Sequence, residues 1–450
     1  MIESNVEVLH GWGMANFARS LVYRPRTLEE VAAAQCDALG RGLTIAHRGA
    51  GLSYGDAALN QGGAVIDLSH LDRILEFDAD TGWVRAEAGV TLRALWERTV
   101  THGWWPPVVA GTMHATLGGC VAMNVHGKNN AQVGSFGEHV EAVTVVRPGE
   151  TARQLTRARD AESLCEIIGA QGLTGTIIDV TLRLKRVHSG MLEVRPIPVR
   201  SLDAAIERVD AEARASDYIV GWLDAFASGA GLGRGLLHAA SFLGPDHPLA
   251  GQALDPVAQR LPERVLGVFP KSASWRILRR FTTNPGMQAI NLGKYLAGRA
   301  AGARPYVQSH AAFHFLLDYI PNWKFAYRPG GLLQYQFFIP AEAAVHVFRE
   351  ALRRQQRSGV LSYLAVLKRH RPDAFAGRYA VDGFSLALDF PVRQETVGAL
   401  GKLCRDFDAL RMEVGGRVYA AKDAVSRGEL PRVRHTMFSS NLVRRWEQDA

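Results

Sequence analysis

Cysteine is scarce in this chain of 450 residues, and long apolar runs are absent. The sequence contains only four cysteines, Cys36, Cys120, Cys165 and Cys404. No two of them form a C-x-x-C pair, so the sequence supports neither a zinc ribbon nor a disulfide-stapled scaffold, and we predict no metal site. This sparse cysteine usage fits a reducing compartment.

The absence of long apolar runs bears on location. No stretch approaches the roughly 18 consecutive apolar residues of a membrane-spanning helix. The first ten residues have neither the basic start nor the apolar run of a secretory signal. We therefore expect a cytoplasmic protein, or one attached peripherally at the inner face of the membrane, with no signal peptide and no transmembrane segment.

The charge balance is moderately basic, with 52 Lys and Arg against 44 Asp and Glu, a net charge of +8. The basic residues are dispersed and accompany no recognition motif, so we expect no nucleic-acid partner. Two local clusters of basic residues could form a solvated basic face. Alternatively, they could contact anionic lipid or a phosphate-bearing substrate. The two clusters are Arg276, Arg279 and Arg280, and Lys368, Arg369 and Arg371.

Glycine, by contrast, is abundant, at 45 of 450 residues. The excess gathers in three clusters, at 47–56, 111–137 and 169–175. The first follows a strand-like segment and could form a nest of N–H groups for a phosphate. No helix follows it and it lacks Gly-Lys-Ser/Thr, so it is neither the dinucleotide fingerprint nor a P-loop. One such cluster could be a plain turn, but three in one domain indicate a long cofactor that orders them.

The periodicity predicts an α+β chain. Apolar positions at helical spacing predict helices at 27–42, 91–103, 341–358 and 395–413. Alternating or apolar runs predict strands at 43–49, 63–71, 83–90, 140–150, 174–187, 217–226, 331–340 and 384–392. In 174–187 the alternation places Ile178, Val180, Leu182 and Leu184 on one face. Segment 245–310 is weakly periodic, and a connection of that length is usually functional or mobile.

The motifs together resemble a known family. Residues 48–56, 111–119 and 172–175 resemble the FAD-binding domain of the vanillyl-alcohol-oxidase or PCMH type. The motifs at 126–129, 134–137, 334–336, 389–391 and 419–423 are similar to those of the decaprenylphosphoryl-β-D-ribose 2-oxidase family, in family order. The resemblance implies a two-subdomain FAD-binding domain in 1–193 that 413–450 completes, and a substrate domain in 194–412 with an antiparallel sheet flanked by helices.

The resemblance also implies which residues hold FAD. The first loop would wrap the pyrophosphate through its backbone N–H groups, and Ile178 would meet the edge of the flavin ring. Many members of the wider fold tether flavin through a histidine where this chain has Leu52, so we expect FAD to be bound non-covalently. The implied cofactor residues are His47, Arg48, Gly49, Ala50, Gly51, Leu52, Ser53, Tyr54, Gly55, Asp56, Gly111, Thr116, Leu117, Gly118, Gly119, Met123, Asn124, Val125, His126, Ile178 and Tyr419.

The implied reaction oxidises the C2 hydroxyl of a polyprenyl-phosphate-linked ribose to a ketone, and a short-chain reductase partner would complete the epimerisation. Lys422 matches the family's essential lysine, whose ammonium can stabilise negative charge on flavin or substrate oxygens. Tyr54 and His126 are the other catalytic candidates. The substrate-binding candidates are Lys128, Gln334, Gln336, Trp323 and Lys422. For each of these residue types a plain structural role, such as a solvated lysine or a core tryptophan, is the alternative.

The sequence departs from the family at two places. Ala387 stands where the family has an inhibitor-reactive cysteine, so thiol-directed inhibitors should not attach. Asn130 and Ala131 follow the 126–129 motif where the family often has two histidines, which leaves fine substrate recognition open. A lipid-linked substrate would explain basic and apolar segments near 270–310 and 360–371 as a peripheral membrane contact.

Two other function classes stay open. An O2-dependent aldonolactone or alditol oxidase commonly carries the tethering histidine and a C-terminal His-Trp-x-Lys, and this chain has neither. A flavin-binding scaffold without activity is disfavoured by the retention of Lys422 and the paired glutamines.

Overall fold

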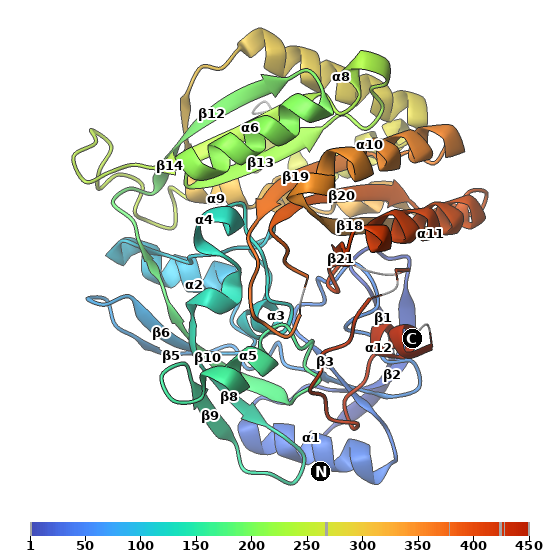
Figure 1. Ribbon diagram of the computed structural model, residues 1–450. Helices are drawn as coiled ribbons and strands as arrows, with labels where there is room; N and C mark the ends of the chain where they lie inside the picture. Colours follow the sequence, from blue (N-terminus) through green and yellow to red (C-terminus); the bar gives the residue numbers. More distant parts are fainter. Residues whose placement is uncertain (1, 266–268, 378, 423–424, 427, 449–450) are drawn as a thin grey trace.

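The computed structural model describes residues 2–448 except 266–268, 378, 423–424 and 427. Asp423, the last residue of the 419–423 motif, therefore lies outside the described residues. The chain forms two lobes (Figure 1): a lower lobe of two sheets with short helices, and an upper lobe around one large sheet. Helices and strands are mixed in both lobes, which confirms the predicted α+β class.

The first sheet of the lower lobe has four strands in the order β1-β2-β4-β3. Strand β1 is antiparallel to β2, while β4 is parallel to both β2 and β3. Helix α1 (Leu28–Gly40) shares a core with this sheet and begins where predicted, because the Thr27 side chain accepts a hydrogen bond from the Glu30 amide. The strands are β1 Ser4–His10, β2 Phe17–Tyr23, β3 Ile45–Arg48 and β4 Ala64–Asp67.

The second sheet is antiparallel, in the order β5-β6-β10-β8-β9. Its strands are β5 Ile74–Phe77, β6 Trp83–Glu87, β8 Val140–Val146, β9 Arg153–Thr156 and β10 Thr176–Arg183. A two-stranded pair joins β7 Trp104–Trp105 to β11 Lys185–Arg186. The helical segments of this part are α2 Leu92–Thr99, η1 Val100–His102, α3 Leu117–Ala122, α4 Asn130–Val133, η2 Phe136–His139 and α5 Ala161–Ile167.

Strand β10 contains a bulge that changes which side chains face the interior. Opposite β8, Ile177 pairs with Val145 and Asp179 with Thr144, so Ile178 has no partner of its own. Ile177 packs in the same core as Val180 and Leu182, whereas Ile178 packs in the core beneath α1. The expectation that Ile178 shares a face with Val180 is therefore wrong, because the extra residue breaks the period of two.

The upper lobe contains an antiparallel sheet of eight strands, in the order β17-β12-β14-β13-β19-β20-β18-β21. This confirms the predicted antiparallel sheet flanked by helices. The strands are β12 Met191–Val199, β13 Tyr218–Leu223, β14 Gly235–Phe242, β17 Tyr306–Ser309, β18 Leu332–Pro340, β19 Leu364–His370, β20 Gly383–Pro391 and β21 Arg417–Val418.

Three helices pack against one face of this sheet: α6 Leu202–Ala215, α10 Ala341–Ser358 and α11 Val397–Glu413 (Figure 1). Side chains on alternate strand positions, such as Ile219, Leu237 and Leu367, form the core beneath them. The intervening positions point to the opposite face, which is turned toward the glycine loops of the lower lobe. Because side chains alternate along each strand, one face of the sheet packs against the helices and the other face can line a site.

The weakly periodic segment 245–310 forms two helices, α7 Ser274–Phe281 and α8 Asn284–Ala301, after a short pair of strands, β15 Arg264–Val265 and β16 Phe269–Pro270, and the turn η4 Lys271–Ala273. Glycines obscure the helical pattern of α8. One of them, Gly298, is required by packing, since a Cβ there would lie 2.4 Å from a methyl carbon of Leu236. Among the described residues, no helix combines the length and the apolar character needed to cross a bilayer.

The remaining short helical segments of the upper lobe are η3 Gly229–Gly231, α9 His310–His314, η5 Leu316–Asp318 and η6 Trp323–Tyr327. After β21 the chain returns to the lower lobe (Figure 1), where Leu442 and Trp446 of helix α12 (Asn441–Gln448) pack with Ala57. Phe438 forms a bridge with Ile45, and Arg445 forms an ion pair with Asp56 at 2.9 Å. The division at 193/194 and 412/413 stays a prediction, since the large sheet itself runs from β12 to β21.

Candidate functional site

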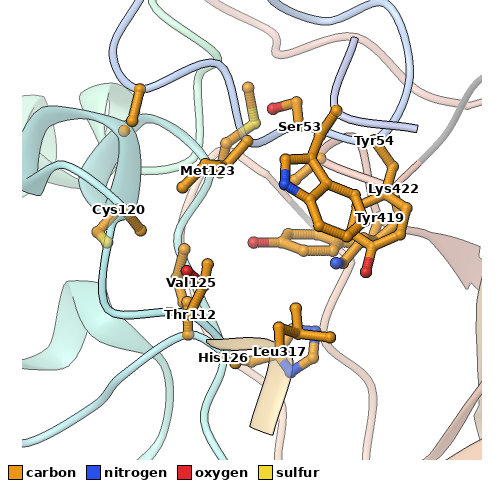
Figure 2. A pocket seen from close by; sticks show the side chains of 18 of the residues that line it. Ser53, Tyr54, Thr112, Cys120, Met123, Val125, His126, Leu317, Tyr419 and Lys422 are labelled. Carbon is orange, nitrogen blue, oxygen red and sulfur yellow. The ribbon is translucent and has the colours of Figure 1, made fainter. Parts of the chain in front are cut away.

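A cavity of about 620 Å³ lies where the glycine loops face the large sheet, a size typical of small-molecule sites. Figure 2 shows side chains from separate parts of the chain around one open space. Ser53 and Tyr54 come from the first glycine loop, His126 from the second, and Lys422 from the C-terminal segment. Residues far apart in the sequence therefore meet only through the tertiary fold.

Most of the predicted site residues line this cavity. The lining residues among those predicted for the cofactor are His47, Arg48, Gly49, Ala50, Gly51, Leu52, Ser53, Tyr54, Gly111, Thr116, Gly118, Gly119, Met123, Val125, His126 and Tyr419. All five predicted substrate residues line it as well: Lys128, Trp323, Gln334, Gln336 and Lys422.

Five predicted cofactor residues do not line the cavity: Gly55, Asp56, Leu117, Asn124 and Ile178. Asp56 holds the C-terminal helix through Arg445. Leu117 is fully buried in the core of the second sheet. The bulge in β10 turns Ile178 toward α1 and leaves its neighbour Ile177 in the lining.

Asn124 is buried behind the second glycine loop and has a structural role. Its Nδ2 donates to Asp373 at 2.9 Å, and its Oδ1 accepts from the Gly137 amide at 2.9 Å. Its backbone has a φ of 44°, in the left-handed region that asparagine tolerates better than most residues. The motif residue therefore shapes the loop instead of facing the cavity.

The glycine loops approach each other so closely that side chains would not fit. A Cβ on Gly49 would lie 2.1 Å from Thr116 Oγ1, and one on Gly118 would lie 2.8 Å from the Cβ of Ala88. Gly51 has a φ of 66°, and a Cβ there would meet the Arg48 guanidinium at 2.0 Å. These loops present bare backbone to the cavity, which suits the close approach of an extended cofactor with a diphosphate.

The charge of the lining also fits such a cofactor. Among the described residues that line the cavity there is no aspartate or glutamate. The cationic side chains in the lining are Arg48, Lys128, Lys294, Lys368 and Lys422. A concave site with one sign of charge attracts anions, so the donor set suits phosphate groups.

Lys422 is the cation at the junction of the two lobes. Its ammonium lies 3.5 Å from the centroid of the Tyr54 ring, within the range of a cation–π interaction. Burial lowers the pKa of Lys422 to about 7, although the nearby Asp389 carboxylate opposes this shift. A lysine with this pKa can exist in either protonation state near neutral pH.

Asp389 lies on β20, directly across the sheet from Gln334 on β18. Gln334 Nε2 donates to Asp389 Oδ1, while Oδ2 has no hydrogen-bond partner among the described residues. Burial raises the pKa of Asp389 to about 6. Burial and the Asp389 charge together hold the pKa of Tyr54 well above its ordinary value, so the phenol stays protonated.

His126, which belongs to the second glycine loop, lies among aromatic rings. Lys368 Nζ is 3.3 Å from its Nδ1, and Gln336 Nε2 is 3.3 Å from its Nε2. Burial and the charges of Lys368, His370 and Lys422 hold the pKa of His126 well below its ordinary value. The ring is therefore neutral, and because an ammonium can only donate, Nδ1 accepts a hydrogen bond from Lys368.

Lys128, the third residue of the 126–129 motif, is anchored to the upper lobe. Its Nζ donates to the carbonyl oxygen of Phe313 and lies 4.3 Å from the centroid of the Phe313 ring. Burial, with a smaller contribution from Lys368, lowers its pKa to about 7. Its backbone carbonyl accepts a hydrogen bond from the Ile219 amide at 2.9 Å. This bond attaches the second glycine loop to strand β13.

The two departures from the family pattern differ in position. Ala387 lines the cavity on β20, opposite Gln336 on β18. Asn130 and Ala131 do not line it. Asn130 Oδ1 accepts from the Arg371 amide at 3.2 Å, and Ala131 packs against the core of the upper lobe. The departure at 130–131 therefore changes the junction between lobes instead of the cavity wall.

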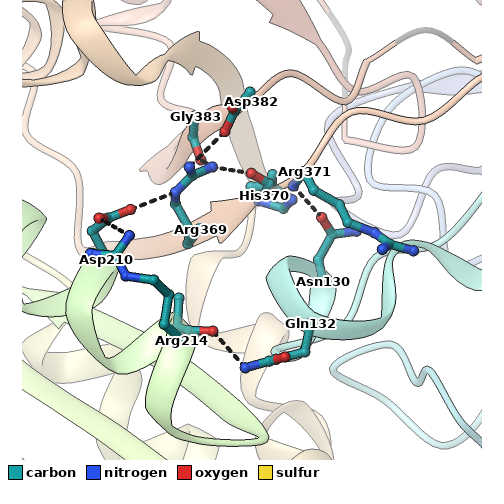
Figure 3. Close-up of polar contacts among 10 residues, drawn as sticks. Asn130, Gln132, Asp210, Arg214, Arg369, His370, Arg371, Asp382 and Gly383 are labelled. Carbon is teal, nitrogen blue, oxygen red and sulfur yellow. Dashed lines mark hydrogen bonds and ion pairs between the residues drawn. The ribbon is translucent and has the colours of Figure 1, made fainter.

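The basic cluster 368–371 is not a surface patch, because β19 is an interior strand of the large sheet. Lys368 faces the cavity. Figure 3 shows Arg369 held on the opposite side by Asp210 of α6 at 2.9 Å and by Asp382 at 2.6 Å. The expectation that 360–371 provides a lipid contact is therefore corrected, whereas Arg276, Arg279 and Arg280 on α7 are exposed.

Sequence reasoning missed several lining residues. Lys368 could have been found from the alternation of Leu364, Val366 and Lys368, which all line the cavity. Trp222 and His238, on β13 and β14, follow the same rule of alternation. Lys294 gave no signal, since it lies on the glycine-interrupted helix α8.

Comparison with known proteins shows which families this chain resembles. Residues 20–156 match the model of the FAD binding domain family. The chain is 32% identical over 395 residues to decaprenylphosphoryl-β-D-ribose oxidase of Mycolicibacterium smegmatis, covering 87% of this chain and 82% of the relative. More distant similarities are to D-lactate dehydrogenase of Anaerostipes hadrus, 30% over 34% of each chain, and to L-galactono-1,4-lactone dehydrogenase of Arabidopsis thaliana, 25% over 37% of this chain and 27% of the relative.

Proposed function

Because the chain belongs to the decaprenylphosphoryl-β-D-ribose oxidase family of FAD-binding oxidoreductases, we propose that it oxidises the C2 hydroxyl of a polyprenyl-phosphate-linked ribose to the 2-keto sugar. As a member of this family it is an FAD-dependent enzyme that acts on a CH–OH group. The finer assignment, to C2 of a lipid-linked pentose, rests on the match to the relative together with the residues that surround the cavity.

The observation that carries the proposal is the position of Lys422 against Tyr54, at the point where the glycine loops meet the sheet face. When bound, FAD would supply the two-electron oxidation, in which the C2 hydrogen would leave as a hydride and the hydroxyl proton would pass to solvent to give a ketone. The Lys422 ammonium would stabilise the negative charge that develops on the C2 oxygen. The Tyr54 ring holds the ammonium in place, and the low-dielectric surroundings strengthen its effect.

Gln334 and Gln336 would orient the sugar. Both line the cavity from β18, two residues apart, so their side chains project from one face of the sheet. Each amide is fixed from behind, Gln334 by Asp389 and Gln336 by Ser385 at 3.2 Å. A fixed amide can both donate to and accept from a sugar hydroxyl. Trp323, with Trp12 at 5.3 Å between ring centroids, would form an apolar wall beside the ribose.

A 2-keto sugar is the first half of an inversion at C2. A short-chain reductase partner would return the ketone to the alcohol of opposite configuration, giving the arabinose form.

We also propose that FAD is held non-covalently, since Leu52 lines the cavity and offers no nucleophile. Denaturing the yellow protein in acid and collecting the supernatant tests this, and flavin that stays with the precipitate would contradict it.

A lipid-linked substrate requires a route from a membrane, and the region of α7 and α8 offers one. Leu278, Leu316 and Tyr319 line the outer part of the cavity. Further apolar side chains are exposed on the same elements: Ile277, Phe281, Leu292 and Leu296. The exposed arginines of α7 accompany them, a combination that favours an anionic lipid surface. Flotation with vesicles containing anionic lipid at low salt should carry the protein upward, and Arg279→Glu with Arg280→Glu should abolish this.

Anaerobic mixing of the purified yellow protein with a prenyl-phospho-ribose tests the main proposal. We expect the flavin absorbance near its visible maximum to bleach with this substrate and to persist with free aldonolactones or polyols. Bleaching with lactones or polyols alone would assign the chain to the aldonolactone or alditol oxidases. No bleaching with either class would leave a flavin-binding scaffold.

A further inference from the structure

The lysines of the cavity form a series along the face of the large sheet. The charge of Lys368 acts on Lys422 and on Lys128, and it lowers the pKa of each. The charges of Lys128 and Lys294 in turn act on His238, whose pKa falls to about 4, chiefly because of burial. Lys422 lies over the ring of Tyr54 in the first glycine loop and Lys294 over the ring of Trp222 on β13, while Lys368 and Lys128 also line the cavity.

Three of these four lysines already have a polar partner. Lys422 faces Asp389, Lys368 donates to His126, and Lys128 donates to the Phe313 carbonyl. Lys294 differs, because the part of the chain that the structure describes offers its ammonium no hydrogen-bond acceptor and no carboxylate partner. Its Nζ instead lies 4.3 Å from the centroid of the Trp222 ring. Lys294 is exposed to solvent, so its three donor positions face water that a ligand can displace.

The surroundings of Lys294 supply the rest of an anion site. Trp222 lies on β13 and His238 on the neighbouring strand β14, and both line the cavity. His238 pairs directly with Val220, which is two residues before Trp222 and therefore on the same face of the sheet. The neutral imidazole of His238 can donate one N–H. Leu364 packs with Trp222, and Leu278 lines the same cavity from α7. A cation and an N–H donor therefore lie beside an apolar wall.

We propose that Lys294 and His238 bind the phosphodiester of the substrate, with Trp222 as the platform that holds the lysine, and that the apolar side chains beyond them receive the first part of the prenyl tail. This inference rests on the proposed function and names the element that recognises the phosphate. In the proposed substrate the phosphate is bonded to C1, next to the carbon that is oxidised, so its binding site belongs to the same cavity. Among the described residues Lys294 is the lysine of the lining without a polar partner, and it lies on α8 between the exposed side chains of Leu292 and Leu296.

Direct binding tests the site without relying on turnover. The probe is farnesyl monophosphate, which has a phosphate and a prenyl tail but no sugar to oxidise, titrated calorimetrically into the FAD-loaded protein. We expect Lys294→Ala to weaken binding about 10- to 100-fold, as for loss of a charged hydrogen bond. Lys294→Arg should bind within about threefold of the parent, because it keeps the charge over the ring.

Two controls separate the phosphate from other causes. Arg299→Ala removes a charge from the same helix at a position outside the cavity lining, and should leave the affinity unchanged. Farnesol, which lacks the phosphate, should bind the parent and Lys294→Ala equally. Visible absorbance checks that each variant keeps its FAD.

Equal affinity of the parent and Lys294→Ala for farnesyl monophosphate would overturn the inference, as would no binding to the parent or an equal loss for farnesol. Loss of FAD from Lys294→Ala would reassign the lysine to the cofactor and overturn it too. The proposed oxidation is judged separately, by flavin bleaching in the parent protein. If the parent binds farnesyl monophosphate through Lys294 but is not bleached by prenyl-phospho-ribose, the proposed phosphate site would stand. The proposed function would then be wrong.

Discussion

The ammonium of Lys422 lies 3.5 Å from the centre of the Tyr54 ring, although the two residues lie near opposite ends of the sequence. The backbone reinforces this contact, because the Tyr54 amide donates to the Ala421 carbonyl at 2.8 Å. The first glycine loop and the returning C-terminal segment therefore hold each other in place. The orientation of the cation depends on both.

Replacing Lys422 by alanine should leave a yellow protein that no longer reduces its flavin. The cavity keeps its glycine loops, so FAD binding persists, whereas the charge that stabilises the C2 oxygen is lost. We expect the rate of anaerobic bleaching to fall by about 10²- to 10³-fold, as for other preorganised electrostatic groups. Normal bleaching in this variant would contradict the role of Lys422 in stabilising the C2 oxygen.

Tyr54 should act mainly through its ring. Tyr54→Phe retains the aromatic face under Lys422, so we expect its bleaching rate to stay within about fivefold of the parent. Tyr54→Leu removes the face and should lose about 10- to 30-fold, in line with up to ~2 kcal/mol for a desolvated cation–π contact. If Phe and Leu cost the same, the hydroxyl and not the ring would be the important group.

The bleaching rate should depend on pH through Lys422. The pKa of Lys422 is lowered to about 7, so the ammonium is lost as pH rises through that value, and the limiting rate should fall between about pH 6 and 8. Lys422→Arg keeps its charge and should show no such fall. Asp389→Asn removes the charge that favours the ammonium, so the fall in the bleaching rate of this variant should occur at lower pH. A rate that rises with pH would contradict the proposed ammonium form.

Gly49 should be intolerant of even a methyl group. A Cβ there would lie 2.1 Å from Thr116 Oγ1, so Gly49→Ala must push the two loops apart and should weaken FAD binding by at least about tenfold. Gly40→Ala is the matched control, because nothing lies within 4 Å of a Cβ at that position. Apoprotein titrated with FAD and followed by flavin fluorescence measures both. Equal affinity would show that the loop does not form the cradle.

Acid should destabilise the fold through buried histidines, of which His310 is one. Burial lowers its pKa to about 4, so between about pH 6.5 and 4 the unfolded chain binds a proton that the folded chain does not. Stability therefore falls as pH falls through this window, by up to ~1.4 kcal/mol per pH unit for each such group. His310→Asn should flatten the slope of urea-unfolding free energy against pH. Equal slopes for His310→Asn and the parent would exclude His310 as a source.

The sequence by itself determined the local structure and the family. Thr27 and Thr91 cap the helices that their periodicity predicts, because capping depends on neighbours within one turn. The glycine clusters mark loops without side chains, since that property is carried by the residues themselves. Backbone chemistry and local spacing are short-range, so they can be read along the chain.

Only the tertiary structure decided which side chains meet. The bulge in β10 exchanges Ile178 for Ile177 in the cavity wall, an outcome set by pairing with β8. Lys368 faces the cavity while Arg369 faces α6, because the interior strand β19 divides alternate residues between two sides. Lys294, on a helix whose glycines obscure its period, reaches the site only through packing on Trp222. These contacts join distant segments, and the large sheet is the element that brings them together.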